Sequence, residues 1–343
     1  MNRLSILICA AAAATLMASC AKENVTHTNE AGKRFLEAWM KINHPDAVKS
    51  GLGIYILEES AGSGKEAGSV KDYPYAYVSY TATDLDGNIS ESTDASVAEQ
   101  LGTYDPAKKY YGPVIRPRNS TAMTAGQEMV INTMRVGGTR KAVIPGWFNT
   151  SSVRYSSEDE YLKNVTGEDV IISVRLHDVI SDLNVWQIDS MTRYMGRELH
   201  ASPDSLKYGF YYIQTQTPVD TTSFKSGSSV YINYTGRRLD GKVFDTTEEK
   251  TAKDAGIYGK GKTYKPLKVT MASEYKDITF STGSGTANFV DGVSYCLSRM
   301  KKGEKGICIF YSELGYKDSG QGNIPGFSPL RFDIEMIGPE LKQ

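Results

Sequence analysis

A strand-and-turn pattern occurs twice in this chain, and it constrains the fold more than any other feature. The first copy is the alternating segment 76–81 followed by Asp86-Gly87, and the second is 229–236 followed by Asp240-Gly241. In both, a tyrosine (Tyr80 or Tyr234) stands at the same distance from the Asp-Gly pair. Alternating apolar residues predict a half-buried strand, and Asp-Gly predicts a tight turn. The chain is therefore expected to build related β structure twice.

The flanking segments repeat in the same order. A helical pattern precedes each copy, at 31–42 and 183–199, and the strands expected behind these helices are 51–57 and 210–213. The short-helix region 126–141 corresponds to 292–307, and the closing strands are 170–176 and 330–336. Few crossover helices separate the strands, which favours an antiparallel α+β sheet wrapped around one short helix over a Rossmann fold. The alternative is two unrelated β domains with chance similarity.

Length and composition agree with two domains. The chain has 343 residues, and single domains commonly have about 100–200. With 40% hydrophobic residues there is enough apolar material for two cores. The net charge of −1 and the lack of a basic tract alternating with aromatics argue against nucleic-acid binding. We predict domains at 31–180 and 181–343.

The N-terminus has the pattern of an export signal. Arg3 precedes an apolar stretch, 4–17, that is shorter than the ~20 residues needed to span a bilayer. It ends in Leu16-Met17-Ala18-Ser19-Cys20, which resembles the lipobox of bacterial lipoproteins. We predict a signal peptide at 1–19, lipidation of Cys20, and a tether at 20–30. Because no aspartate follows Cys20, we expect an outer-membrane lipoprotein of the cell envelope, on its periplasmic or surface face. The alternative is an ordinary signal peptide cleaved near Ala18.

Two cysteines remain in the predicted mature domains, Cys296 and Cys308. A disulfide is one reading for an exported protein, and two free thiols are the other. Cys308 lies in an apolar segment typical of a buried strand. Cys296 lies on a predicted helix whose inward positions are Val293, Leu297 and Met300. This pattern favours two free thiols that face different ways.

The second copy carries an ordered series of short motifs. In chain order they are Tyr234-Thr235-Gly236, Asp240-Gly241, Phe244-Asp245, Phe280 with Gly283, Phe289-Val290-Asp291-Gly292-Val293, Met300 to Lys305, Leu314-Gly315-Tyr316, Ile324-Pro325 and Leu330 to Phe332. From about Val230 to Ile337 the chain thereby resembles the FK506-binding-protein (FKBP) type of peptidyl-prolyl cis-trans isomerase. The resemblance implies two tandem FKBP-like domains, the first degenerate, each preceded by a helix.

The resemblance also implies a site. Its catalytic residues would be Tyr234, Asp245 and Tyr316. The substrate-binding residues would be Phe244, Phe289, Val290, Val293, Ile324 and Phe332. The Val290 backbone N–H and the Tyr316 hydroxyl would donate to substrate carbonyls, and Asp245 would lie near the twisting amide. The implied substrates are proline-containing polypeptides, and no metal or cofactor is required.

The chemistry suits these residue types. A prolyl amide prefers trans by only ~0.5–1 kcal/mol, but rotation crosses a barrier of ~18–20 kcal/mol because resonance is lost as the C–N bond twists. A catalyst needs an apolar site that removes the amide from water, a hydrogen-bond donor and a shape that fits the twisted form. Neither His-x-x-x-His metal-ligand spacing nor a Gly-x-Ser-x-Gly elbow competes with this reading.

The sequence departs from the family pattern in three places. Val293 stands where the family usually has tryptophan at the pocket floor, and Ile278 replaces a common aromatic. The segment 248–279 replaces a much shorter loop, and its glycines and tyrosines suggest a hairpin or flap near the pocket. In the first copy Ser90 and Glu91 replace the Phe-Asp pair, so we interpret that copy as non-catalytic and as having lost the polar groups of the site.

We therefore expect a prolyl isomerase that assists the folding of exported proteins by binding Xaa-Pro in an apolar pocket. The alternative is a non-catalytic FKBP-fold chaperone or assembly lipoprotein. A third hypothesis, a surface accessory for nutrient binding, is suggested only by the predicted lipid anchor and the 22 tyrosines.

Overall fold

The computed structural model describes residues 28–51 and 53–340. The predicted signal peptide, Cys20 and most of the tether lie outside these ranges. Contacts divide the chain into two compact units, one made of residues up to Glu66, Ala82–Ser90 and Asn119–Val174, the other of Ala67–Thr81, Glu91–Arg118 and the chain from Arg175 onward. The boundary near residue 180 stays a prediction. Within the described ranges, no helix combines the length and apolarity needed to cross a bilayer.

The N-terminal copy starts with the predicted helix and continues, within the described residues, into seven strands and three further α-helices. Its helices are α2 (Thr28–Asn43), α3 (Ala95–Gln100), α4 (Ala125–Asn132) and α5 (Glu158–Asn164). Its strands are β1 (Val48–Lys49), β2 (Tyr55–Ser60), β3 (Tyr75–Thr83), β4 (Ile89–Ser92), β5 (Val114–Pro117), β6 (Thr139–Ile144) and β7 (Val170–Ile180). They form a sheet in the order β1-β2-β6-β7-β3-β4, with β5 paired to β3. The strand expected at 51–57 begins only at Tyr55, since a turn precedes it.

The C-terminal copy starts with the same order of elements, a helix, four strands, a short helix and a fifth strand, and then adds two short strands. Its helices are α6 (Leu183–Glu198), α7 (Glu249–Asp254) and α8 (Asp291–Leu297), with 3-10 turns η2 (Tyr275–Asp277) and η3 (Ser312–Leu314). Its strands are β8 (Ser205–Lys207), β9 (Phe210–Gln216), β10 (Ser229–Arg238), β11 (Val243–Thr246), β12 (Leu267–Thr270), β13 (Thr279–Ser281), β14 (Thr286–Asn288), β15 (Lys305–Phe310) and β16 (Leu330–Gly338).

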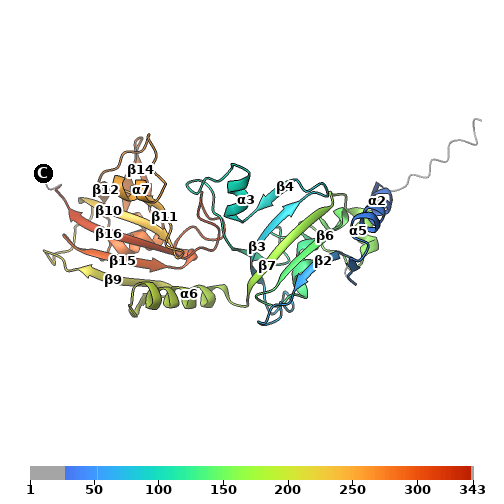
Figure 1. The fold of residues 1–343 in the computed structure, drawn as a ribbon. Helices are drawn as coiled ribbons and strands as arrows, with labels where there is room; N and C mark the ends of the chain where they lie inside the picture. The colour runs from blue at the N-terminus through green and yellow to red at the C-terminus, as the bar shows by residue number, and fades with distance from the viewer. Residues whose placement is uncertain (1–27, 52, 341–343) are drawn as a thin grey trace, which may run out of the picture. The chain divides into compact units, whose positions relative to one another are not determined.

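The two sheets share their central connectivity. The second sheet runs β14-β13-β12-β10-β16-β15-β9-β8, with β11 paired to β10. Its middle, β10-β16-β15-β9, has the same chain order as β3-β7-β6-β2 in the first sheet. The paired strands of the second sheet are antiparallel, as β10 with β16 and β15 with β9 show. The predicted α+β class with antiparallel sheets is confirmed (Figure 1).

Strand β15 shows why this sheet needs a helix on each face. Cys308 and Phe310 belong to the large core beneath α8, whereas Ile309 packs with Met191 and Met195 of α6. Successive side chains of a strand point to opposite faces, so an apolar strand must be covered twice. Figure 1 shows α6 lying along the strands β9 and β15. The helix predicted at 183–199 thus covers the face of its sheet that α8 leaves open.

Helix α8 can approach the sheet closely because Gly292 lacks a side chain. A Cβ at this position would lie 2.4 Å from the ring of Phe310, which is fully buried. The first copy repeats the arrangement, since a Cβ on Gly126 of α4 would lie 2.1 Å from Ile144. Real Cβ contacts are not this short, so in both copies the helix reaches the sheet through a glycine.

The two cysteines correct one expectation. Both are buried, free thiols, as the sequence favoured. However, they do not face different ways. Both lie in the core beneath α8, and burial together with a hydrogen bond from Cys296 raises the pKa of the Cys308 thiol. The buried face of α8 is wider than its sequence pattern predicts, because it includes Cys296 as well as the neighbouring Leu297.

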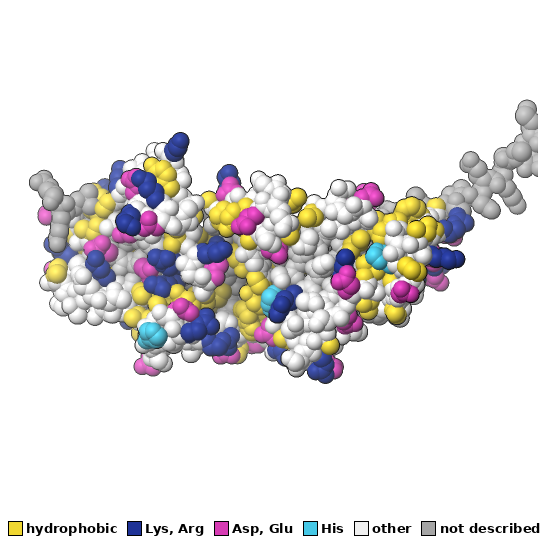
Figure 2. All heavy atoms as spheres, viewed as in Figure 1, with side chains coloured by type: hydrophobic (Ala, Val, Ile, Leu, Met, Phe, Trp, Pro, Cys, Tyr) yellow, Lys and Arg dark blue, Asp and Glu magenta, His cyan; other side chains and the backbone are white. Residues whose placement is uncertain are grey.

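Charged side chains of both signs are mixed over the face seen in Figure 2. No extensive patch of one sign stands out on that face, in keeping with the net charge of −1.

The close approach of α8 gives a first prediction. Gly292→Ala should destabilise the protein by about 1–3 kcal/mol, because the added methyl group overpacks against Phe310. Gly196→Ala is the control: it lies on α6, a Cβ added there would have nothing within 4 Å, and the change should be neutral or stabilise by about 0.5–1 kcal/mol. The measurement is chemical denaturation. Equal stability of the Gly292→Ala and wild-type proteins would contradict the packing argument.

Candidate active site

The residues predicted to form the site come together in one place. Val293, Ile324 and Phe332 are buried in the core beneath α8. Five others are partly buried and pack against that core: Tyr234, Phe244, Phe289, Val290 and Tyr316. They come from β10, β11, the start of α8, the loop after η3 and β16. The ninth predicted residue, Asp245, joins them through a hydrogen bond to Tyr234.

Three aromatic rings form the apolar wall. The ring of Phe332 lies 5.5 Å from that of Phe244 at an angle of 76°, and 6.0 Å from that of Tyr234. Tilted and edge-on pairs of this kind are the favoured geometry for aromatic side chains. Gly236 is the directly paired neighbour of Phe332 on β10, and a Cβ there would lie 2.6 Å from Phe244. This glycine makes room for the rings, a role that its place in a sequence motif did not reveal.

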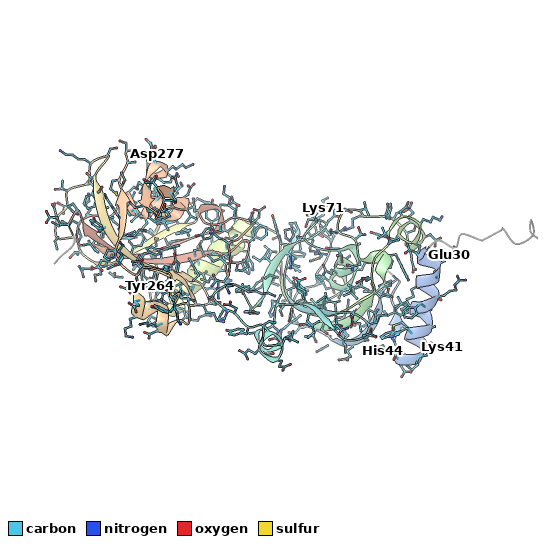
Figure 3. The ribbon with its side chains drawn as sticks, turned by 90° about the horizontal axis from the view of Figure 1, so that it is seen from above. Glu30, Lys41, His44, Lys71, Tyr264 and Asp277 are labelled. Atoms are coloured by element: carbon cyan, nitrogen blue, oxygen red, sulfur yellow. The ribbon has the colours of Figure 1, made fainter. Side chains whose placement is uncertain are left out.

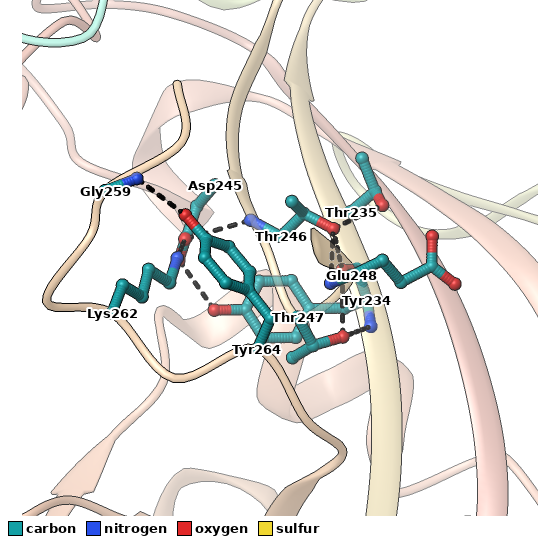
Figure 4. A network of polar contacts seen from close by, with 9 residues as sticks. All are labelled: Tyr234, Thr235, Asp245, Thr246, Thr247, Glu248, Gly259, Lys262 and Tyr264. Carbon is teal, nitrogen blue, oxygen red and sulfur yellow. Dashed lines mark hydrogen bonds and ion pairs between the residues drawn. The ribbon is translucent and has the colours of Figure 1, made fainter. Parts of the chain in front are cut away.

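Asp245 is the centre of the polar part of the site (Figure 4). The Tyr234 hydroxyl donates to its Oδ2 at 2.6 Å, and the Thr246 backbone N–H donates to its Oδ1 at 2.9 Å. The Lys262 ammonium also pairs with Oδ1. The backbone of Tyr234 is held in turn, because its N–H donates to Thr247 Oγ1 at 3.0 Å. The carboxylate is thus oriented from three sides.

Burial keeps the two tyrosines as neutral donors. Loss of water contact raises the pKa of Tyr234 far above its usual value, and the negative charge and hydrogen bond of Asp245 raise it further. Burial likewise raises the pKa of Tyr316, again with Asp245 as the second cause. Both hydroxyls therefore remain protonated at any physiological pH. The shared dependence on Asp245 shows that the three predicted catalytic residues lie within electrostatic reach of one another.

The floor position is filled by a small residue. Val293 is 2% exposed and lies on α8 within the same core as Phe332. Ile278 is also fully buried in this core. Val290 is the residue before the first turn of α8, with an extended backbone. Its N–H therefore has no partner within the helix, as the resemblance requires of a donor to substrate.

The insertion contains a residue that the sequence did not single out. The segment 248–279 forms α7, a loop, β12 and η2, and its glycines lie in the loop, which is a flap rather than a hairpin. The loop does lie near the site, since it brings Lys262 to Asp245. No motif marks Lys262, and 17 positions separate it from its partner. The one sequence signal for this residue is its positive charge, in a glycine-rich segment that follows the predicted catalytic Asp245.

The first copy keeps more of the polar arrangement than expected. The Tyr80 hydroxyl donates to Glu91 Oε1 at 2.5 Å, and Arg116 contacts both groups. Tyr80 and Glu91 are separated by the same 11 positions as Tyr234 and Asp245. The interpretation that this copy lost the polar groups is therefore wrong for the tyrosine–carboxylate pair. The longer glutamate reaches the hydroxyl as the aspartate does.

The described part of the chain offers no cluster of metal ligands. No group of three or more His, Cys, Asp or Glu side chains there could hold a metal ion. What the site offers is an apolar wall, two neutral hydroxyl donors and one oriented carboxylate.

The segment that carries this arrangement matches a known family. The family described as FKBP-type peptidyl-prolyl cis-trans isomerase matches residues 220–337. FK506-binding protein 2 of Debaryomyces hansenii is 30% identical over 127 residues, which cover 36% of this chain and 75% of that protein. The chain belongs to the FKBP-type peptidyl-prolyl isomerase family. The predicted enzyme class is confirmed at this level.

Further relatives show a similar level of identity. FK506-binding protein 2 of Dictyostelium discoideum is 29% identical over 136 residues, covering 39% of this chain and 80% of that protein. The macrophage infectivity potentiator of Trypanosoma cruzi is 30% identical, but the match spans only 40% of its length and 31% of this chain. The three FKBP domains of wheat FKBP73 align with 83% of this chain at 14% identity and a TM-score of 0.29. Family membership therefore rests on the sequence matches.

The tyrosine–carboxylate pair of this FKBP-family chain can be tested directly. Tyr234→Phe should lower the free energy of unfolding by about 1 kcal/mol, because Asp245 loses a hydroxyl donor while the ring is kept. Tyr231→Phe on the same strand is the control for loss of a tyrosine hydroxyl. Denaturant titration measures both. Indistinguishable Tyr234→Phe and wild-type proteins would show that the hydrogen bond contributes nothing to stability.

Proposed function

We propose that the C-terminal copy catalyses cis–trans isomerisation of Xaa-Pro bonds in exported polypeptides. The observation that carries the proposal is the convergence of Tyr234, Asp245 and Tyr316 on one aromatic wall built around Phe332. These are the groups that a resonance-breaking site needs, and they lie in the segment that matches the isomerase family.

The proposed mechanism uses binding alone. The proline ring would enter against Phe244, Phe332 and Val293, with Phe289, Val290 and Ile324 completing the apolar surface. Removing the amide from water disfavours its charge-separated resonance form, so less energy is needed to twist the C–N bond. The Tyr316 hydroxyl and the Val290 N–H would hold the flanking carbonyls in the twisted geometry. Interactions that are stronger in the twisted form than in either planar form lower the barrier.

The role of Asp245 follows from its contacts. It orients the Tyr234 hydroxyl, and its negative charge at the rim of the apolar wall is paired with the Lys262 ammonium. As the amide twists, its nitrogen gains electron density and becomes pyramidal. The Asp245 carboxylate and the groups that donate to it would keep a fixed arrangement of charges and dipoles beside this nitrogen. No covalent step and no proton transfer is required.

The activity has a direct test. The full chain should accelerate isomerisation of a proline tetrapeptide above background. Asp245→Ala should lower kcat/KM about 10- to 100-fold, as expected for loss of a charged hydrogen-bonding group at ~1.5–3 kcal/mol, and Tyr316→Phe about 5-fold for one neutral hydrogen bond. Tyr208→Phe, an exposed tyrosine outside the site, is the control.

A second candidate function is a non-catalytic FKBP-fold chaperone or assembly factor. The small floor residue Val293 and the lysine on Asp245 favour it. Suppression of client aggregation that survives both substitutions, with no isomerisation rate in the wild type, would select it over the enzyme.

We also propose that the chain is an outer-membrane lipoprotein acylated on Cys20. In a bacterial host fed an alkyne-labelled fatty acid, the wild type should carry the label and fractionate with the outer membrane. Cys20→Ser should lose the label, whereas Cys296→Ser, a buried thiol, should keep it. An unlabelled wild-type protein that starts just after Ala18 would instead indicate an ordinary signal peptide.

A further inference from the structure

The insertion places a cation on the carboxylate of the site. The Lys262 ammonium pairs with Asp245 Oδ1 and also lies 5.5 Å from the centre of the Tyr264 ring. In Figure 4 the lysine reaches toward Asp245 from the loop, on the side opposite Thr246. Since the carboxylate comes from β11 and the lysine from the loop between α7 and β12, the pair ties the loop to the site.

The loop is built to hold this position. We call residues 255–266 the strap. The rings of Tyr258 and Tyr264 stack at 5.3 Å and 16°, and the Gly259 N–H donates to the Tyr264 hydroxyl at 2.9 Å. Lys253 of α7 lies 5.0 Å from the Tyr258 ring. Figure 3 shows Tyr264 at the periphery of its unit, well apart from Asp277 of η2. The ring stacking, the hydrogen bond and the contact with Lys253 restrict the positions that the Lys262 side chain can take.

The pair is at the rim rather than in the core. The Lys262 and Asp245 side chains keep 42% and 38% of their exposure. Ion pairs this exposed stay hydrated and are screened by salt, so the lysine adds little to stability. Its larger effect is on the charge that an incoming peptide meets. With Lys262 in place the charge of Asp245 is paired, and without it the Asp245 carboxylate would attract cations and repel anions.

We propose that Lys262 is a specificity-determining residue, which lets the site accept acidic residues beside proline by neutralising Asp245. This inference rests on the proposed isomerase function of the same site. On this proposal the function of the strap is to hold a cation beside the bound substrate, from a segment outside the sheet.

The test compares three proline tetrapeptides with Glu, Leu or Lys before the proline. Assayed in the full chain at low salt, Lys262→Ala should raise the ratio of kcat/KM for the Lys-Pro over the Glu-Pro peptide by about 2- to 5-fold. Lys262→Glu should raise it further, and Lys262→Arg should keep the wild-type ratio. Lys260→Ala, an exposed lysine two positions earlier on the strap, is the matched control. Added salt should shrink the differences.

Tyr264→Ala removes the ring that supports the strap and should shift the ratio in the same direction although Lys262 is present. An unchanged ratio in Lys262→Ala, or an equal fall for all three peptides, overturns the inference while leaving the isomerase function standing. Absence of any rate in the wild type refutes the isomerase function instead. If the wild type has no rate, NMR titration measures the affinity of each peptide instead. An unchanged ratio of the Lys-Pro to the Glu-Pro affinity in Lys262→Ala then overturns the inference.

Discussion

The rest of the C-terminal copy depends on the packing of the Phe332 ring. It stacks on Phe310 at 5.8 Å and 11°, and Phe310 lies against Gly292 of α8. On its other sides it meets Phe244 and Tyr234. One side chain therefore belongs to the hydrophobic core and to the wall of the site. Because cores are close-packed, the position of the helix and the shape of the wall cannot vary independently.

On this apolar base the polar groups are few, and most of them converge on Asp245. Tyr234, Thr246 and Lys262 all contact Asp245, so the carboxylate at the wall is oriented before any substrate arrives. Preorganised dipoles need no rearrangement when the reacting group changes shape. A prolyl amide changes shape and polarity without breaking a bond, and a site with fixed donors on an apolar wall suits such a reaction.

In the two copies, different cations pair with the carboxylate that accepts the tyrosine hydroxyl. In each, a tyrosine on the central strand donates to a carboxylate 11 positions later. Arg116, on strand β5 of the same sheet, balances Glu91, whereas Lys262 on the strap balances Asp245. A cation in a strand is held by backbone pairing, but a cation on a loop is held only by the contacts of that loop.

The sequence by itself determined the local features: the strands, the helix α6, the turn spacing and the motif order that points to the family. These follow from periodicity and turn chemistry, which act over a few residues. Only the tertiary structure decided that Lys262 meets Asp245, that Glu91 keeps the role of an aspartate, and that Cys296 and Cys308 share one core. Such contacts depend on the path of a loop or the rotation of a helix, and packing sets both.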